Sequence, residues 1–310
     1  MGSAFDSGGG MKASIITIVG AGLVEPLLAI SLRQRGFPVV LYERRGDMRR
    51  VPVSDGRSIN LAVSAHGIYA LQQAGVWSEL RDIVIPMGGR LMRLLTGELI
   101  FQPYGEDETE VINSVSRAAL NIALLDAAEA AGVVIHFQRR CLGCARTDDG
   151  IVVRLHDEES GRETSIAAEV VIGADGSSSA VREEMSRWPG FRLSQERLNY
   201  GYKELTIPAG QGGSHAMETR AVHIWPRGPY MLIALPNVDG TYGCILFLPF
   251  EGERGFAALA SKSRVVDFFP PNFPDAFALM PNLAANYFAN GGGSALATGY
   301  EAGHDPGPNE

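Results

Sequence analysis

Two glycines near the start of the chain could hold the phosphates of a nucleotide. Gly20 and Gly22 end an apolar run at residues 15–19 and precede a stretch, residues 23–35, whose apolar residues recur at helical spacing. A glycine turn of this kind lets the backbone approach a pyrophosphate, and the free N–H groups at the start of the next helix attract an anion. These residues therefore predict a phosphate-binding turn between a strand and a helix.

An acidic residue completes the pattern. Glu43 stands about 20 residues past the glycines, where an acid can accept a hydrogen bond from a ribose hydroxyl. It follows a second apolar run at residues 37–42. Residues 16–45 thus predict a βαβ unit that binds a dinucleotide. The alternative is a Rossmann-like unit that packs in the same way and binds nothing.

One position departs from the usual G-x-G-x-x-G pattern. Glu25 stands where the third glycine is expected. That glycine normally allows close packing of the helix on the strand. A glutamate adds bulk and brings a carboxylate near the place where an anionic pyrophosphate would lie. We therefore expect Glu25 to oppose nucleotide binding.

The composition excludes several other classes of protein. The chain has 310 residues, is 45% hydrophobic and 20% charged, and carries a net charge of −8. These values are typical of a globular protein, and no basic cluster indicates nucleic-acid binding. No apolar run is long enough to cross a membrane. We expect a cytoplasmic protein, and the sequence does not predict its oligomeric state.

The cysteines and histidines do not form a recognisable metal site. Cys141 and Cys144 have C-x-x-C spacing, but no second pair of ligands accompanies them, and Cys244 stands alone. We interpret all three as ordinary thiols in a reducing compartment. His223 and Trp225 are expected to pack within a sheet rather than to take part in catalysis.

The order of the elements predicts an α/β fold in two parts. A Rossmann-type domain over residues 11–199 contains a β-meander crossover at residues 141–168, followed by a buried strand that leads into Gly173-Ala174-Asp175-Gly176. Residues 200–290 predict a mostly antiparallel sheet and a helix. Residues 1–10 are expected to be a tail or an expression remnant, and residues 291–310 a disordered tail.

Five short strings point to a known family. They are GRSINL at residues 56–61, QPYG at 102–105, GYKEL at 201–205, HIWP at 223–226 and IALPN at 233–237. Together with the glycine turn, Glu43 and the Gly173–Gly176 string, they resemble the FAD-dependent aromatic hydroxylases of the p-hydroxybenzoate hydroxylase type. Within that group, the chain resembles the kynurenine 3-monooxygenase family over about residues 14–297.

The resemblance implies an FAD-binding domain and a set of residues that hold FAD. Glu43 and Arg44 would lie at the adenosine ribose, and Asp175 near the pyrophosphate and ribose. The full implied set is Gly20, Gly22, Glu43, Arg44, Arg57, Leu61, Arg117, Gly173 and Asp175. Without the resemblance, a surface or structural role is the alternative for Arg57 and Arg117, and for Arg90.

The resemblance also implies a site for kynurenine, to which residues 85–105 contribute. Arg90 and Tyr104 would hold its carboxylate, which suits a guanidinium fork and a phenol. The apolar wall around its ring would consist of Val222, Met231, Ile233 and Phe247. Ile233 and Phe247 would be sheet core on any reading.

The implied reaction places the chemistry on the cofactor. NADPH reduces FAD, and the reduced flavin takes up O2 as a C4a-hydroperoxide that hydroxylates the aromatic amino acid. No side chain is then required as a nucleophile or metal ligand, so we expect no catalytic residue in the strict sense. The partners are the aromatic amino acid and O2, without nucleic acid.

One family feature is missing from this sequence. No Gly-Asp motif follows the antiparallel sheet, so we expect a C-terminally shortened member. Three hypotheses remain open. The chain is a kynurenine hydroxylase, a truncated or degenerate relative that binds a nucleotide or an aromatic acid without catalysis, or a flavoprotein of the family with another aromatic substrate.

Overall fold

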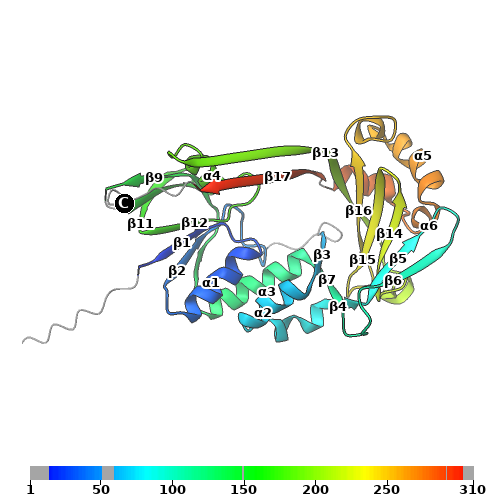
Figure 1. Ribbon diagram of the computed structural model, residues 1–310, viewed down its shortest axis with the longest axis horizontal. Helices are drawn as coiled ribbons and strands as arrows, with labels where there is room; N and C mark the ends of the chain where they lie inside the picture. The colour runs from blue at the N-terminus through cyan, green and yellow to red at the C-terminus, as the bar shows by residue number, and fades with distance from the viewer. Residues whose placement is uncertain (1–13, 51–58, 149, 291, 303–310) are drawn as a thin grey trace, which may run out of the picture. The chain divides into compact units, whose positions relative to one another are not determined.

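The computed structural model describes residues 14–50, 59–148, 150–290 and 292–302 (Figure 1). The chain divides into two compact units. Unit 1 comprises Met1–Asp47 and Leu125–Trp188, and unit 2 comprises Met48–Leu124 and Pro189–Glu310. This division differs from the expected domain over residues 11–199, because Met48–Leu124 and residues 189–199 group with the second sheet.

Unit 1 is built on a parallel sheet of four strands in the order β12-β1-β2-β8. The strands are β1 (Ile16–Val19), β2 (Val39–Tyr42), β8 (Val134–His136) and β12 (Val170–Gly173). Helix α1 (Val24–Gln34) connects β1 to β2. Every residue of β1 is buried, as expected for an inner strand of a parallel sheet. This arrangement confirms the predicted βαβ unit.

An antiparallel meander follows in the order β11-β10-β9. Its strands are β9 (Arg139–Thr147), β10 (Gly150–Asp157) and β11 (Glu163–Ala168), and the short helix α4 (Ala180–Met185) follows β12. Cys141 and Cys144 are buried in β9, and both are free thiols. Burial raises the pKa of the Cys141 thiol to about 11, so this thiol is not a reactive thiolate.

Unit 2 contains a sheet of seven strands in the order β17-β13-β16-β15-β14-β5-β6. In chain order these are β5 (Gly89–Arg93), β6 (Leu99–Pro103), β13 (Phe191–Ile207), β14 (Ala221–Arg227), β15 (Tyr230–Pro236), β16 (Tyr242–Pro249) and β17 (Gly292–Ala302). Neighbours pair antiparallel except β14 and β5, which are parallel. The predicted antiparallel sheet is confirmed.

One face of this sheet is covered by helices (Figure 1). They are α5 (Lys262–Asn272), α6 (Pro274–Ala278) and α7 (Leu283–Ala289). Phe269 and Phe273 from α5 and its C-terminal end pack in one core with Trp225, Leu232 and Leu246 from the strands. Because side chains alternate along a strand, the residues between these strand positions lie on the opposite face, which we call the open face.

Unit 2 also contains a small antiparallel sheet in the order β3-β7-β4, which periodicity did not predict. Its strands are β3 (Asn60–Val63), β4 (Val84–Met87) and β7 (Ile112–Ser116). The remaining helices are α2 (Ala65–Gln73), the 3-10 helices η1 (Trp77–Ile83), η2 (Gln211–Gly213) and η3 (Phe256–Leu259), and α3 (Arg117–Ala130), which crosses from unit 2 into unit 1. None of the described helices combines the length and apolar character needed to cross a bilayer.

The expectation of a disordered C-terminal tail from residue 291 is wrong for residues 292–302. These residues form β17, which pairs antiparallel with β13 from Gly292↔Lys203 to Ala302↔Phe191. The segment is rich in glycine and has little to bury, which is why its composition resembled a tail. Its order comes from backbone hydrogen bonds to the edge of a long strand, and such bonds do not depend on side chains. Residues 303–310 lie outside the described residues.

Candidate functional site

The glycine turn of unit 1 has the geometry that the sequence predicts. Gly20 has a φ of +110°, and a Cβ atom at this position would lie 2.9 Å from the carbonyl oxygen of Ala174. Its N–H donates to the carbonyl oxygen of Tyr42 at the end of β2. Both the backbone angle and the close approach therefore require glycine at position 20.

Glu43 closes this turn from the end of β2 and is 5% exposed. Its Oε2 accepts the N–H of Ala21 at 2.8 Å, and its Oε1 accepts the N–H and Nε of Arg45 at 2.9 and 2.8 Å. Burial acts to raise the pKa of Glu43, but the hydrogen bonds and charge of Arg45 outweigh it and lower the pKa. The carboxylate is therefore ionised and oriented at the mouth of the turn.

The arginine that pairs with Glu43 is Arg45, which sequence reasoning missed. The resemblance assigns Arg44, and not Arg45, to the cofactor set, and both residues are exposed. The only signal in the sequence is that Arg45 lies two residues from Glu43. Arg45 is thus the cation that stabilises the ionised Glu43.

Glu25 occupies the inside of the same turn. It is 6% exposed. Its Oε1 lies 2.7 Å from the position of a Cβ on Gly20, and its Oε2 lies 3.0 Å from that of a Cβ on Gly22. Burial raises the pKa of Glu25, and the nearby Glu43 carboxylate raises it further. Hydrogen bonds from the N–H groups of Glu25 and Gly22 lower it, but the net effect is a raised pKa. Amide donors at the start of α1 therefore already bind a carboxylate of the chain itself.

The second predicted fingerprint of unit 1 has a clear structural role. The carboxylate of Asp175 accepts the hydroxyl of Ser179 and the N–H of Ala180, the latter at 2.6 Å, and so caps the start of α4. A Cβ atom on Gly173 would lie 2.6 Å from Cβ of Val181. Gly173 thus permits close packing of α4 on β12.

Three further residues of the predicted cofactor set belong to unit 2. Arg57 lies outside the described residues. Leu61 is half-buried in β3, where it pairs with Val115 of β7. Arg117 begins α3, with its side chain exposed and its N–H donating to the carbonyl oxygen of Ile59 at 3.0 Å. Their contacts with a cofactor stay a prediction.

The predicted substrate residues share the open face of the seven-stranded sheet. The pairs Arg90↔Val222 and Met231↔Phe247 each place two of them side by side, and Ile233 follows Met231 by the two-residue period of a strand. Val222 is 7% exposed and packs against Met87 of β4, whereas Met231 is 38% exposed. The strand register thus brings together residues from four strands.

Arg90 and Tyr104 form the polar part of this face. The guanidinium carbon of Arg90 lies 5.3 Å from the centre of the Tyr104 ring. Burial raises the pKa of Tyr104, while the hydrogen bond and charge of Arg90 act to lower it. Among the described residues, no carboxylate pairs with Arg90. The side chain is exposed, so its cationic fork is available to an anion.

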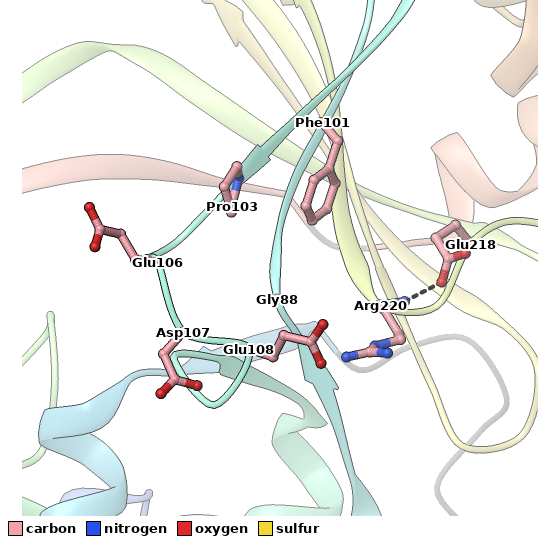
Figure 2. Close-up of a pocket in the computed structure, with 9 residues that line it drawn as sticks. Gly88, Phe101, Pro103, Glu106, Asp107, Glu108, Glu218 and Arg220 are labelled. Carbon is pink, nitrogen blue, oxygen red and sulfur yellow. Dashed lines mark hydrogen bonds between the residues drawn. The ribbon is translucent and has the colours of Figure 1, made fainter.

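A separate pocket of about 720 Å³ lies at the base of the β5–β6 hairpin (Figure 2). Phe101 and Pro103 of β6 line it, together with Glu106, Asp107 and Glu108 from the following loop and Glu218 and Arg220 from the segment before β14. None of the predicted substrate residues lines this pocket. The acidic rim would repel a carboxylate, so we do not assign the amino-acid substrate to it.

Comparison with known proteins identifies relatives over most of the chain. The family described as "FAD binding domain" matches residues 12–226. A protein of Myxococcus xanthus named kynurenine 3-monooxygenase is 47% identical over 92% of this chain and 61% of its own length. Its namesake in Flavobacterium johnsoniae is 45% identical over 90% of this chain and 62% of its own length. The chain thus spans about three fifths of the length of these relatives.

Solved structures with low sequence identity share the fold. A 2-methyl-3-hydroxypyridine-5-carboxylic acid oxygenase variant superposes with a TM-score of 0.69 at 19% identity, over 94% of this chain and 72% of its own. A Klebsiella pneumoniae HpxO variant complexed with FAD gives a TM-score of 0.65 at 18% identity, over 93% of this chain and 68% of its own. These likenesses support the fold class and carry no argument about substrate.

Proposed function

The chain belongs to the FAD binding domain family, and from this premise we propose that it acts as an FAD- and NADPH-dependent aromatic hydroxylase whose substrate is kynurenine. One observation carries the substrate class. Arg90, without a carboxylate partner among the described residues, lies beside Tyr104 on the face that also holds Val222, Met231 and Phe247. A cationic fork next to an apolar wall suits an aromatic amino acid.

The residues of unit 1 suit the adenosine and pyrophosphate end of FAD, with one exception. Gly20 allows a close backbone approach, and the ionised Glu43 is placed to accept from a ribose hydroxyl. Glu25 is the exception, because its carboxylate uses an amide donor that a pyrophosphate would need. We propose that FAD binds in this turn after displacing the Glu25 carboxylate.

Bound FAD, reduced by NADPH, would supply the activated oxygen for hydroxylation. The chain's own residues have a different task. Arg90 and Tyr104 hold the carboxylate of the amino acid, and the apolar side chains of the open face hold its ring and exclude water. No side chain needs to act as nucleophile or metal ligand. The three free, buried cysteines support our proposal of a cytoplasmic location.

The test has two steps. The absorption spectrum of the purified protein between about 350 and 500 nm shows whether a flavin is bound. Oxidation of NADPH on addition of L-kynurenine, with 3-hydroxykynurenine identified by mass spectrometry, then tests the reaction. A flavin-bound protein that does not respond to kynurenine would favour another aromatic substrate.

A second candidate function rests on Glu25. If the carboxylate is not displaced, the chain would bind an aromatic acid on the open face without holding FAD. A colourless protein that binds kynurenine in calorimetry and gains no flavin on incubation with FAD would support this second function.

A further inference from the structure

A partly buried polar cluster lies on the strand that carries Arg90. On β5, Arg93 donates from Nε to Nδ1 of His223 at 2.9 Å and from Nη1 to Oδ2 of Asp275 at 3.0 Å. Its guanidinium also lies 5.2 Å from the centre of the Trp225 ring, and Trp225 Nε1 donates to Oδ1 of Asp275 at 2.8 Å. We call these four residues the Arg93 clamp. It joins β5, β14 and α6.

The clamp requires one protonation state of His223, which is fully buried. Its Nε2 lies 2.6 Å from the carbonyl oxygen of Glu218, and its Nδ1 faces the Nε–H donor of Arg93. These partners assign a neutral imidazole with the proton on Nε2. Burial lowers the pKa of His223 to about 4, with the Arg93 charge acting in the same direction, so the ring is neutral near pH 7.

The strand that the clamp holds has weak support from its backbone. β5 pairs with β14 in parallel over a short register, from Gly89↔Ala221 to Met92↔Ile224. Its other neighbour, β6, is an edge strand whose residues are all exposed. Parallel pairing is slightly less stable per residue, and a slip of one residue would turn every side chain to the opposite face.

The clamp and the predicted carboxylate site lie on opposite faces of one strand. Arg93 points to the face under the helices, where it meets His223 and Asp275. Arg90, an odd number of residues earlier, therefore points to the open face, as its pairing with Val222 also requires. Fixing the side chain of Arg93 on one face of β5 therefore fixes the position of the Arg90 side chain on the other face.

We propose that Arg93 and His223 are positioning residues that hold β5 in register, so that Arg90 and Tyr104 meet the carboxylate of the amino-acid substrate. This inference rests on the proposed function, because it takes kynurenine as the ligand of the open face. It assigns no contact between Arg93 or His223 and the substrate. Both residues would act through Arg90.

The experiment compares two ligands, L-kynurenine and its decarboxylated analogue, by calorimetric titration of the whole chain. We expect Arg93→Gln and His223→Asn to weaken kynurenine binding about tenfold, the lower part of the range for a hydrogen bond to a charged group. Binding of the decarboxylated analogue should stay unchanged, because that ligand does not use Arg90. Arg220→Gln, on the rim of the separate pocket, is the matched control and should bind both ligands as the unsubstituted chain does.

A second comparison asks whether the effect passes through Arg90. In an Arg90→Ala background, Arg93→Gln should cause no additional loss of kynurenine affinity. Equal weakening of both ligands would overturn the proposal, because it would indicate a general loss of structure. An additive loss in the Arg90→Ala background would overturn it as well.

Two further controls keep the test decisive. If Arg93→Gln does not fold, Asp275→Asn keeps the size of the side chain and removes its charge and one of the two oxygens that accept from Arg93 and Trp225. This variant should give a smaller loss of kynurenine affinity and leave binding of the analogue unchanged. Hydrogen exchange should be faster in β5 and β6 of the variants and unchanged in β16. Unchanged exchange in β5 would contradict the proposed role.

Failure of the unsubstituted chain to bind either ligand would instead refute the proposed function, and the inference with it.

Discussion

The two regions predicted to bind anions differ in how their donors are used. In the glycine turn of unit 1, the donors are backbone N–H groups, and carboxylates of the chain already accept from several of them: Glu43 from Ala21, and Glu25 from Gly22. On the open face of unit 2, the donor is the side chain of Arg90, and no described carboxylate pairs with it.

The difference shows what each region needs before it can bind a ligand. A phosphate entering the turn must replace an internal carboxylate, so part of its binding energy is offset by the contacts that are lost. A carboxylate reaching Arg90 replaces only water and the interaction with Tyr104. We therefore expect the open face to bind the amino acid without losing an internal ion pair, and the glycine turn to bind the nucleotide weakly. The glycine turn is nevertheless the stronger sequence signal.

The largest expected effect is at Arg90. Arg90→Ala should weaken kynurenine binding about 100-fold, because a hydrogen-bonded charge opposite the carboxylate is lost. FAD content should not change, since Arg90 belongs to the open face of unit 2. Calorimetry with kynurenine and the flavin absorbance of the same sample measure both quantities. Loss of flavin would show that Arg90 serves the nucleotide and not the amino acid.

The next effect is a dependence of the free energy of unfolding on pH, which we expect in unit 2. The pKa of His223 is lowered from 6.5 to about 4 in the folded chain, so the unfolded chain binds more protons between these values. The contribution of neutral His223 is complete above pH 6.5 and is lost as the pH falls towards 4. We expect unfolding of unit 2 to become easier by about 2 kcal/mol between pH 7 and 5.

Urea unfolding at the two pH values measures this change. It is followed by tryptophan fluorescence in a chain where Trp188, the tryptophan of unit 1, is replaced by Phe. The matched variant is His223→Asn, which has no group that titrates at this position and should lose most of the pH dependence. An unchanged pH dependence in the variant would show that other groups cause it.

A smaller effect is expected at Glu25. Glu25→Gly should raise FAD affinity about tenfold, because it frees amide donors and removes a buried carboxylate from the turn. Glu25→Gln keeps the size of the side chain and removes its charge, so an intermediate gain would separate electrostatics from bulk. Titration with FAD, followed by quenching of flavin fluorescence, gives the affinities. Equal affinities in all three chains would mean that the turn already accommodates Glu25.

The smallest effect is expected at Tyr104. Tyr104→Phe keeps the ring beside Arg90 and removes only the hydroxyl. Kynurenine binding should weaken about threefold, because Arg90 still pairs with the carboxylate and water replaces the hydroxyl. The decarboxylated analogue serves as the control and should bind equally well to both chains. A loss as large as that of Arg90→Ala would assign Tyr104 a role in orienting Arg90.

The sequence by itself determined the features that depend on near neighbours. The β1-α1-β2 unit, the meander and the antiparallel sheet that contains β14 to β16 follow from periodicity and turn residues. The conflict at Glu25 was also visible, because it lies only three residues from Gly22. Contacts within one helical turn leave a local pattern that can be read directly.

Only the tertiary structure decided which distant segments meet. Arg93 and His223 are 130 residues apart, and no pattern at either position announced their contact. The pairing of β17 with β13 and the β3-β7-β4 sheet were equally invisible. The reason is physical: backbone hydrogen bonds are available to almost every residue, so register is set by the packing of whole faces and not by any short string.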